Sequence, residues 1–169
     1  PTNIEITHTL AQILRQTGDI EAREFRIDAA RAAYAEGISV AAELDELHPD
    51  VPHVRQELAE LHQSAGTLHG LLEDANLTPA GLEHQLQALE IGRDLALKFP
   101  QQVDRRLALA RYEASLADAY RHLGRADEAR QTIESARETL NVATAVAGDN
   151  FDVLFSLANL QLQLTDVSR

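Results

Sequence analysis

Hydrophobic residues recur along the chain at the three- and four-residue spacing of an α-helix. The pattern is most regular between residues 102 and 123, where one face is marked by Leu109, Leu116, Ala117, Tyr120 and Leu123. This spacing gives a helix one continuous apolar stripe. The apolar residues are mainly Ala and Leu, and β-branched residues are scattered, which favours helices over strands. We therefore expect an all-α fold.

Prolines and glycines divide this pattern into separate helices. Proline can begin a helix, because the first turn does not use the amide hydrogen that it lacks. Glycine is common where a helix ends. The prolines between apolar runs are Pro49, Pro52, Pro79 and Pro100, and the glycines at run ends are Gly18, Gly124 and Gly148. The expected helices are 3–16, 19–47 with a break near Ala29, 51–72, 79–98, 102–123, 126–147 and 149–164. Short connections make consecutive helices antiparallel.

The sequence also repeats itself. An offset of 51 residues superposes Leu58-Ala59 on Leu109-Ala110, and a further offset of 48 reaches Leu157-Ala158. Two columns of small residues recur in the same way: Ala30, Gly81 and Ala129, and then Gly37, Ala88 and Ala136. Small residues let packed helices approach closely. We therefore expect a single domain, 1–169, with one helical hairpin repeated at 1–48, 49–99 and 100–148, followed by a terminal helix at 149–165. Stacked hairpins would leave an inner groove.

The segment 116–136 resembles the tetratricopeptide repeat. Its signature positions are Leu116, Ala117, Tyr120, Gly124, Ala129, Ile133 and Ala136. The first repeat is aligned on Leu10, Ala11, Leu14, Gly18, Ala30, Tyr34 and Gly37, with extra residues between Gly18 and Ala30. The second is aligned on Gly66, His69, Gly81, Gln85 and Ala88, with Glu73 where glycine is usual. The resemblance implies antiparallel hairpins stacked as a right-handed α-α superhelix.

The repeats are longer than those of the common family pattern. Offsets of 48 and 51 residues exceed the usual period of about 34. The leader Pro-x-x-x-x-x-Arg-x-x-Leu-Ala at residues 49–59 is similar to long repeats of bacterial proteins that often carry serine/threonine kinase domains. The resemblance implies that the chain is a fragment of a larger bacterial signalling protein, although the chain itself contains no kinase motif.

Composition excludes several classes of partner and chemistry. The formal net charge of −12 opposes attraction to nucleic acid. Cysteine is absent, so thiolate chemistry is excluded. The chain has neither an apolar run of membrane-spanning length nor the features of a signal peptide at its first residues, and we expect a cytoplasmic protein without a membrane partner. Acidic residues dominate between residues 34 and 90, as a solvated surface or as a surface for a basic partner.

The sequence contains no recognised motif for metal binding or catalysis. The richest polar turn contains Asp45, Glu46, His48, Asp50 and His53, but this spacing matches no ligand motif. His62, His69 and His84 form a second candidate group, although His69 occupies a packing column. No serine has the context of a nucleophile, and phosphate-binding and metalloprotease motifs are absent. We expect no cofactor, no resident metal and no enzyme activity.

The resemblance instead implies a binding face on the first helix of each hairpin. The positions carried over are His8, Gln12 and Arg15 in the first repeat, Glu60, Gln63 and Thr67 in the second, and Arg111, Ala114, Asp118, Arg121 and His122 in the third. The basic group in the third repeat could hold a carboxylate, and Glu60 would favour a basic residue. We expect a scaffold that binds a protein or peptide. A self-associating or spacer module is the alternative, followed by a metal-binding or enzyme-accessory domain.

Overall fold

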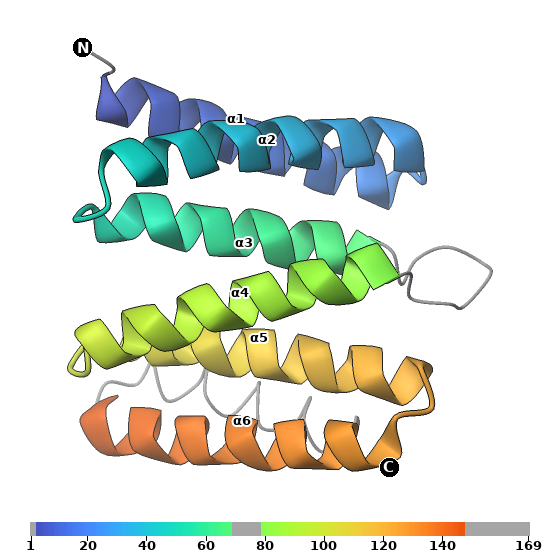
Figure 1. The fold of residues 1–169 in the computed structure, drawn as a ribbon, viewed down its shortest axis with the longest axis vertical. Coiled ribbons are helices and arrows are strands. Elements are labelled where there is room, and N and C mark those ends of the chain that lie inside the picture. The colour runs from blue at the N-terminus through green and yellow to red at the C-terminus, as the bar shows by residue number, and fades with distance from the viewer. Residues whose placement is uncertain (1–2, 69–78, 148–169) are drawn as a thin grey trace. The chain divides into compact units, whose positions relative to one another are not determined.

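The computed structural model describes residues 3–68 and 79–147, and this part of the chain is helical with short connections. Its helices are α1 (Ile4–Arg23), α2 (Ile27–Leu47), α3 (Pro52–Leu68), α4 (Pro79–Lys98), α5 (Val103–His122) and α6 (Ala126–Ala147) (Figure 1). The predicted all-α class is confirmed. The expected helix 149–164 lies outside the described residues.

The chain divides into two compact units, Pro1–Ile91 and Gly92–Arg169. The boundary falls inside α4 and therefore inside the second of the expected hairpins. Within the first unit α1 and α2 form a hairpin, and α3 packs beside them. Within the second unit α5 and α6 form a hairpin of the same kind.

The first hairpin turns later than the sequence indicated. The predicted end of the first helix at Gln16 is wrong, because α1 runs through Gly18 to Arg23. A break in the long second segment is confirmed, but it lies between Arg23 and Ile27 instead of near Ala29. The chain turns at Phe25, whose φ of 57° is left-handed. This conformation usually requires glycine, and because Phe25 stands there, no glycine marks the turn.

The turn after α1 has the same hydrogen bonds as the turn after α5. Arg26 N–H donates to the Glu21 carbonyl at 2.9 Å, and Arg125 N–H donates to the Tyr120 carbonyl at 2.9 Å. Gly124, with φ of 69°, therefore corresponds to Phe25 and not to Gly18. The alignment of the first repeat is corrected accordingly: Gly18 shares its column with Gly66 and Ala117.

This column explains why small residues recur. At its two glycines the small residue lies beneath a larger residue from the second helix of the hairpin: Gly18 beneath Tyr34, and Gly66 beneath Gln85. The corresponding Ala117 and Ile133 belong to one buried core cluster. A Cβ at Gly18 would lie 2.4 Å from Tyr34 Cε1, and one at Gly66 would lie 2.8 Å from Gln85 Nε2. The two helices of a hairpin thus approach more closely than two ordinary side chains would permit.

The other predicted columns are also buried. The small residues Ala30, Gly81 and Ala129 and their counterparts Gly37, Ala88 and Ala136 are inside. The pairs Leu58-Ala59 and Leu109-Ala110 are buried as well, whereas Leu157-Ala158 lies outside the described residues. These aligned positions are therefore buried in the described part of both units.

Candidate partner-binding face on helices α1 and α3

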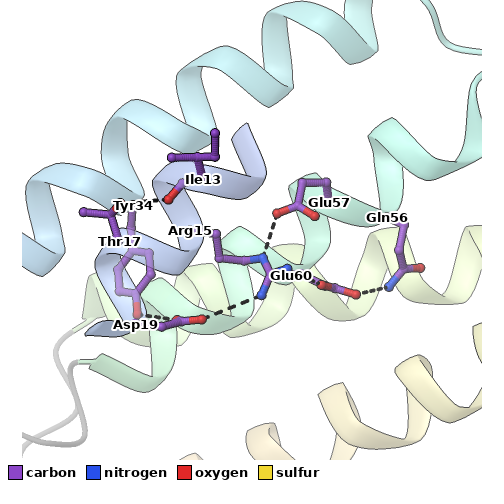
Figure 2. Close-up of polar contacts among 8 residues, drawn as sticks. All are labelled: Ile13, Arg15, Thr17, Asp19, Tyr34, Gln56, Glu57 and Glu60. Atoms are coloured by element: carbon purple, nitrogen blue, oxygen red, sulfur yellow. Dashed lines mark hydrogen bonds and ion pairs between the residues drawn. The ribbon is translucent and has the colours of Figure 1, made fainter. Parts of the chain in front are cut away.

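One arginine joins the neighbouring first helices of the first unit. Arg15 Nε on α1 donates to Glu57 Oε1 on α3 at 2.7 Å, and Arg15 Nη2 lies 3.1 Å from Glu60 Oε2 (Figure 2). Arg15 Nη1 also lies 3.7 Å from Asp19 Oδ2, one turn further along α1. Residues three and four apart share a helix face, so each helix presents two members of this group to the other.

The charges of this group do not cancel. Burial disfavours the charge on Arg15, but the hydrogen bond to Glu57 and the carboxylates of Glu57, Glu60 and Asp19 outweigh it and raise the pKa of Arg15. Glu57 is only 4% exposed, so its carboxylate depends on Arg15 for compensation. One guanidinium faces three carboxylates, and Glu60 and Asp19 keep about a quarter of their side-chain surface exposed, at 27% and 28%. The face therefore carries an acidic excess toward solvent.

Asp19 is also fixed from the second helix of its hairpin. The Tyr34 hydroxyl donates to Asp19 Oδ1 at 2.8 Å (Figure 2). Burial, with a further contribution from Asp19, raises the pKa of Tyr34 well above its ordinary value. Tyr34 therefore stays protonated and remains a donor, which leaves Asp19 with a defined orientation.

A small pocket adjoins this group. It has a volume of about 160 Å³ and is lined by Asp19, Ala22, Tyr34, Gln63, Ser64, Thr67 and Leu68. A cavity of about 150 Å³ is large enough for a benzene ring. The pocket can therefore receive one side chain of a partner, with apolar walls on one part of its surface and polar groups on the other.

The pocket's polar rim is ordered by bonds within the protein. Thr67 Oγ1 donates to the Gln63 carbonyl at 2.9 Å and accepts from Gln85 Nε2 at 3.3 Å. Gln85 is buried, and it occupies the column of Tyr34 in the first hairpin and Ile133 in the third. The polar substitution in this column thus supports the rim of the pocket.

The structure brings most of the predicted first-unit residues together. Arg15, Glu60, Gln63 and Thr67 belong to the salt-bridge group and the adjoining pocket. Gln12 lies one turn before Arg15 on α1 and is half-buried.

His8 lies nearer the beginning of α1, apart from this group. It packs against His53 with the ring centroids 4.7 Å apart.

Sequence reasoning missed three members of the face: Asp19, Tyr34 and Glu57. The shifted first repeat assigned His8 to the binding set in place of Asp19. The column of Gly18, Gly66 and Ala117 would have corrected this, because it places Asp19 in the column of Thr67 and Asp118. No local signal in the sequence marks Glu57, whose role depends on the packing of α3 against α1.

In the second unit, the predicted residues lie on α5. Arg121 Nη2 lies 2.7 Å from Asp118 Oδ1, and His122 Nε2 lies 3.4 Å from Asp118 Oδ2. Arg111 is exposed and Ala114 is half-buried. Asp118 therefore holds Arg121 and His122 together at the end of the helix, where basic side chains also interact favourably with the helix dipole.

Each unit has a partly buried polar pair that includes one equivalent position of the first helix, His62 in the first unit and Glu113 in the second. In the first unit, His62 Nδ1 lies 2.9 Å from His84 Nδ1. Burial, followed by the charge of His84, lowers the pKa of His62 to about 4. Glu113 occupies the column of His62 in the second unit, and Ser135 Oγ donates to Glu113 Oε1. Glu113 is 1% exposed, and burial raises its pKa.

Comparison of the chain with protein-family models, with curated proteins and with solved structures gave no match. Among the helices in residues 3–68 and 79–147, none is both long and apolar enough to cross a membrane.

Proposed function

We propose that this chain is a protein-interaction module of the tetratricopeptide type, which binds a peptide or protein segment on the first helices of its hairpins and catalyses no reaction. The observation that carries the proposal is the α1–α3 face: a fixed row of charged side chains beside a pocket the size of one side chain. Such a combination suits recognition of an extended segment, with the pocket selecting a residue and the charges setting its orientation.

The first unit favours a partner with a basic residue next to a small apolar or aromatic one. The acidic excess around Arg15 attracts the positive charge, and Ala22, Tyr34 and Leu68 supply apolar walls for the neighbouring side chain. On α5 the exposed Arg111, Arg121 and His122 favour a carboxylate instead. Each face is proposed as a binding surface in its own right.

The wider setting is part of the same proposal. The repeated hairpin core and the long repeat period fit the bacterial long-repeat arrays that accompany signalling kinases, and we infer a role inside a cytoplasmic signalling protein. The net charge of −12 favours a protein partner over nucleic acid.

A displayed library of random peptides, selected on the full chain, tests the proposal. We expect enriched peptides with a basic residue for the first unit, and Glu60→Arg should lower their affinity about tenfold or more in calorimetry. Glu90→Arg makes the same charge change on an exposed site of α4 and should leave the affinity unchanged. Failure to enrich any peptide, or equal loss in both variants, would contradict the proposal.

For the second unit, reversing the charge of two arginines tests the α5 face, and the same change on α6 is the control. Arg111→Glu with Arg121→Glu should abolish binding of an enriched acidic peptide while helicity is retained. Arg130→Glu with Arg137→Glu makes the same charge change on α6 and should have no such effect. Equal binding by the α5 double variant would reject this face.

Self-association is a second candidate function, favoured by one apolar stripe. Ile6, Leu10, Ile13 and Ile20 follow one face of α1 and are each at least 44% exposed. Leu58 and Leu109, which occupy the column of Leu10, are only 8% and 7% exposed. A second copy of the chain could cover this stripe, in the way that the rest of the fold covers Leu58 and Leu109. Light scattering over a range of concentrations should then show a dimer that Leu10→Glu dissociates, and a constant monomer mass would exclude it.

A further inference from the structure

We infer that Glu5, His8 and His53 form a binding site for a first-row divalent metal ion such as Zn²⁺. The three side chains are the group of histidines and carboxylates that converges in the described part of the chain: one potential ligand atom from each lies within 4.8 Å of the other two. The site is independent of the proposed peptide-binding function.

The geometry comes from two helices. Glu5 and His8 are three residues apart in the first turns of α1, so they project from one face. His53 is the second residue of α3, and its ring meets that of His8 edge to face with centroids 4.7 Å apart. His53 Nε2 lies 3.8 Å from Glu5 Oε1. The sequence did not predict this group, because it placed His53 with the acidic turn that precedes α3.

Little movement is needed to close the group around an ion. Donor atoms in a tetrahedral zinc site lie about 3.4 Å from one another, as bond lengths of about 2.0–2.1 Å require. The Glu5 and His53 side chains are 79% and 45% exposed and can change rotamer without displacing the core. The partly buried His62 and His84 are instead held by each other, since their Nδ1 atoms lie 2.9 Å apart.

The ligand set selects the class of metal. Two imidazoles and one carboxylate suit Zn²⁺, Ni²⁺, Cu²⁺ or Fe²⁺, whereas Mg²⁺ and Ca²⁺ prefer oxygen ligands alone. Three protein ligands leave a fourth position for water or for a donor from another molecule. A bound ion would also join α1 to α3, so it should stabilise the first unit.

Titration of the metal-free full chain with Zn²⁺, followed by calorimetry, tests the site. We expect one Zn²⁺ per chain, and His8→Ala, His53→Ala and Glu5→Gln should each weaken binding about tenfold or more. His122→Ala, which removes an exposed histidine from α5, should leave the affinity for Zn²⁺ unchanged, and Mg²⁺ should not compete for the site.

A second readout separates this site from loose binding at other histidines. Zn²⁺ should raise the denaturant midpoint of the wild-type chain, and this increase should be lost in His53→Ala. Unchanged Zn²⁺ affinity in the three ligand variants, or no binding at about millimolar Zn²⁺, would overturn the inference.

Discussion

At the residue scale, the most informative position is Gly18. Its place between apolar residues suggested a helix end, because glycine is usually found there. In the structure it lies inside α1 under the ring of Tyr34. A sequence shows that a residue is small but not whether the reason is a turn or a close contact. The repeated column with Gly66 and Ala117 distinguishes the two, because a position that accepts alanine does not require a left-handed backbone.

Gly18→Ala should lower the free energy of unfolding by about 1–3 kcal/mol, although alanine is the better helix former. The added Cβ would lie 2.4 Å from Tyr34 Cε1 and would force the ring or the helix to move. Gly18→Ala combined with Tyr34→Ile recreates the pair Ala117 and Ile133, and should lose less stability than the two single changes added together. Urea unfolding of the three variants measures this coupling, and additive losses would contradict the packing argument.

The partly buried His62 leads to a second prediction at this scale. The pKa of His62 is about 4 in the folded chain and near 6.5 in the unfolded chain. Between these values the unfolded chain binds more protons, so the free energy of unfolding should fall as pH falls from about 6.5 toward 4. The loss between pH 7 and pH 5 should be about 1 kcal/mol, allowing for the partial exposure of the ring.

His62→Leu should remove much of this pH dependence, since Leu14 occupies the equivalent position in the first hairpin. Denaturant unfolding at pH 7 and pH 5 measures it, with His122→Leu as the control on an exposed histidine. An unchanged difference between the two pH values in His62→Leu would show that the pair is not responsible.

At the scale of helices, the sequence predicted where α4 and α6 begin and end, because prolines and glycines mark their limits. It did not predict the length of α1. The turn at Phe25 lacks the usual residue for a left-handed backbone, and the hydrogen bonds of Arg26 show that the chain turns there regardless. The contacts between α1 and α3 could not be predicted either. Arg15 and Glu57 come from separate expected hairpins, and no motif in the sequence around them indicates that they pair.

Arg15→Met should lower the free energy of unfolding by about 1–3 kcal/mol, because it leaves the buried carboxylate of Glu57 without its partner. Arg15→Met with Glu57→Gln should recover part of that loss, as a buried pair costs less to remove than to break. Arg130→Met breaks the exposed pair with Asp127 and should change stability by less than about 0.5 kcal/mol. A thermal or urea unfolding series gives all three values; equal losses for Arg15 and Arg130 would refute the structural role of Arg15.

At the scale of the whole molecule, periodicity predicted the all-α class and the burial of the aligned small residues, since both depend on regular spacing. The sequence predicted only part of the proposed binding face on α1 and α3. Arg15, Glu60, Gln63 and Thr67 lie in this face. Asp19 joins it through Arg15 and Tyr34, and Glu57 joins it through the contact between α1 and α3. The net charge of −12 adds a long-range attraction for a basic partner, so its association should slow as salt is raised.

We propose that partners bind on the first helices of the hairpins. Backbone and side-chain chemical-shift mapping by NMR, with a selected basic peptide titrated into the labelled chain, tests it most directly. We predict that the largest shifts will lie at Arg15, Asp19, Glu60, Gln63 and Thr67. Shifts confined to the exposed faces of α2 or α6, with these five residues unaffected, would contradict the claim.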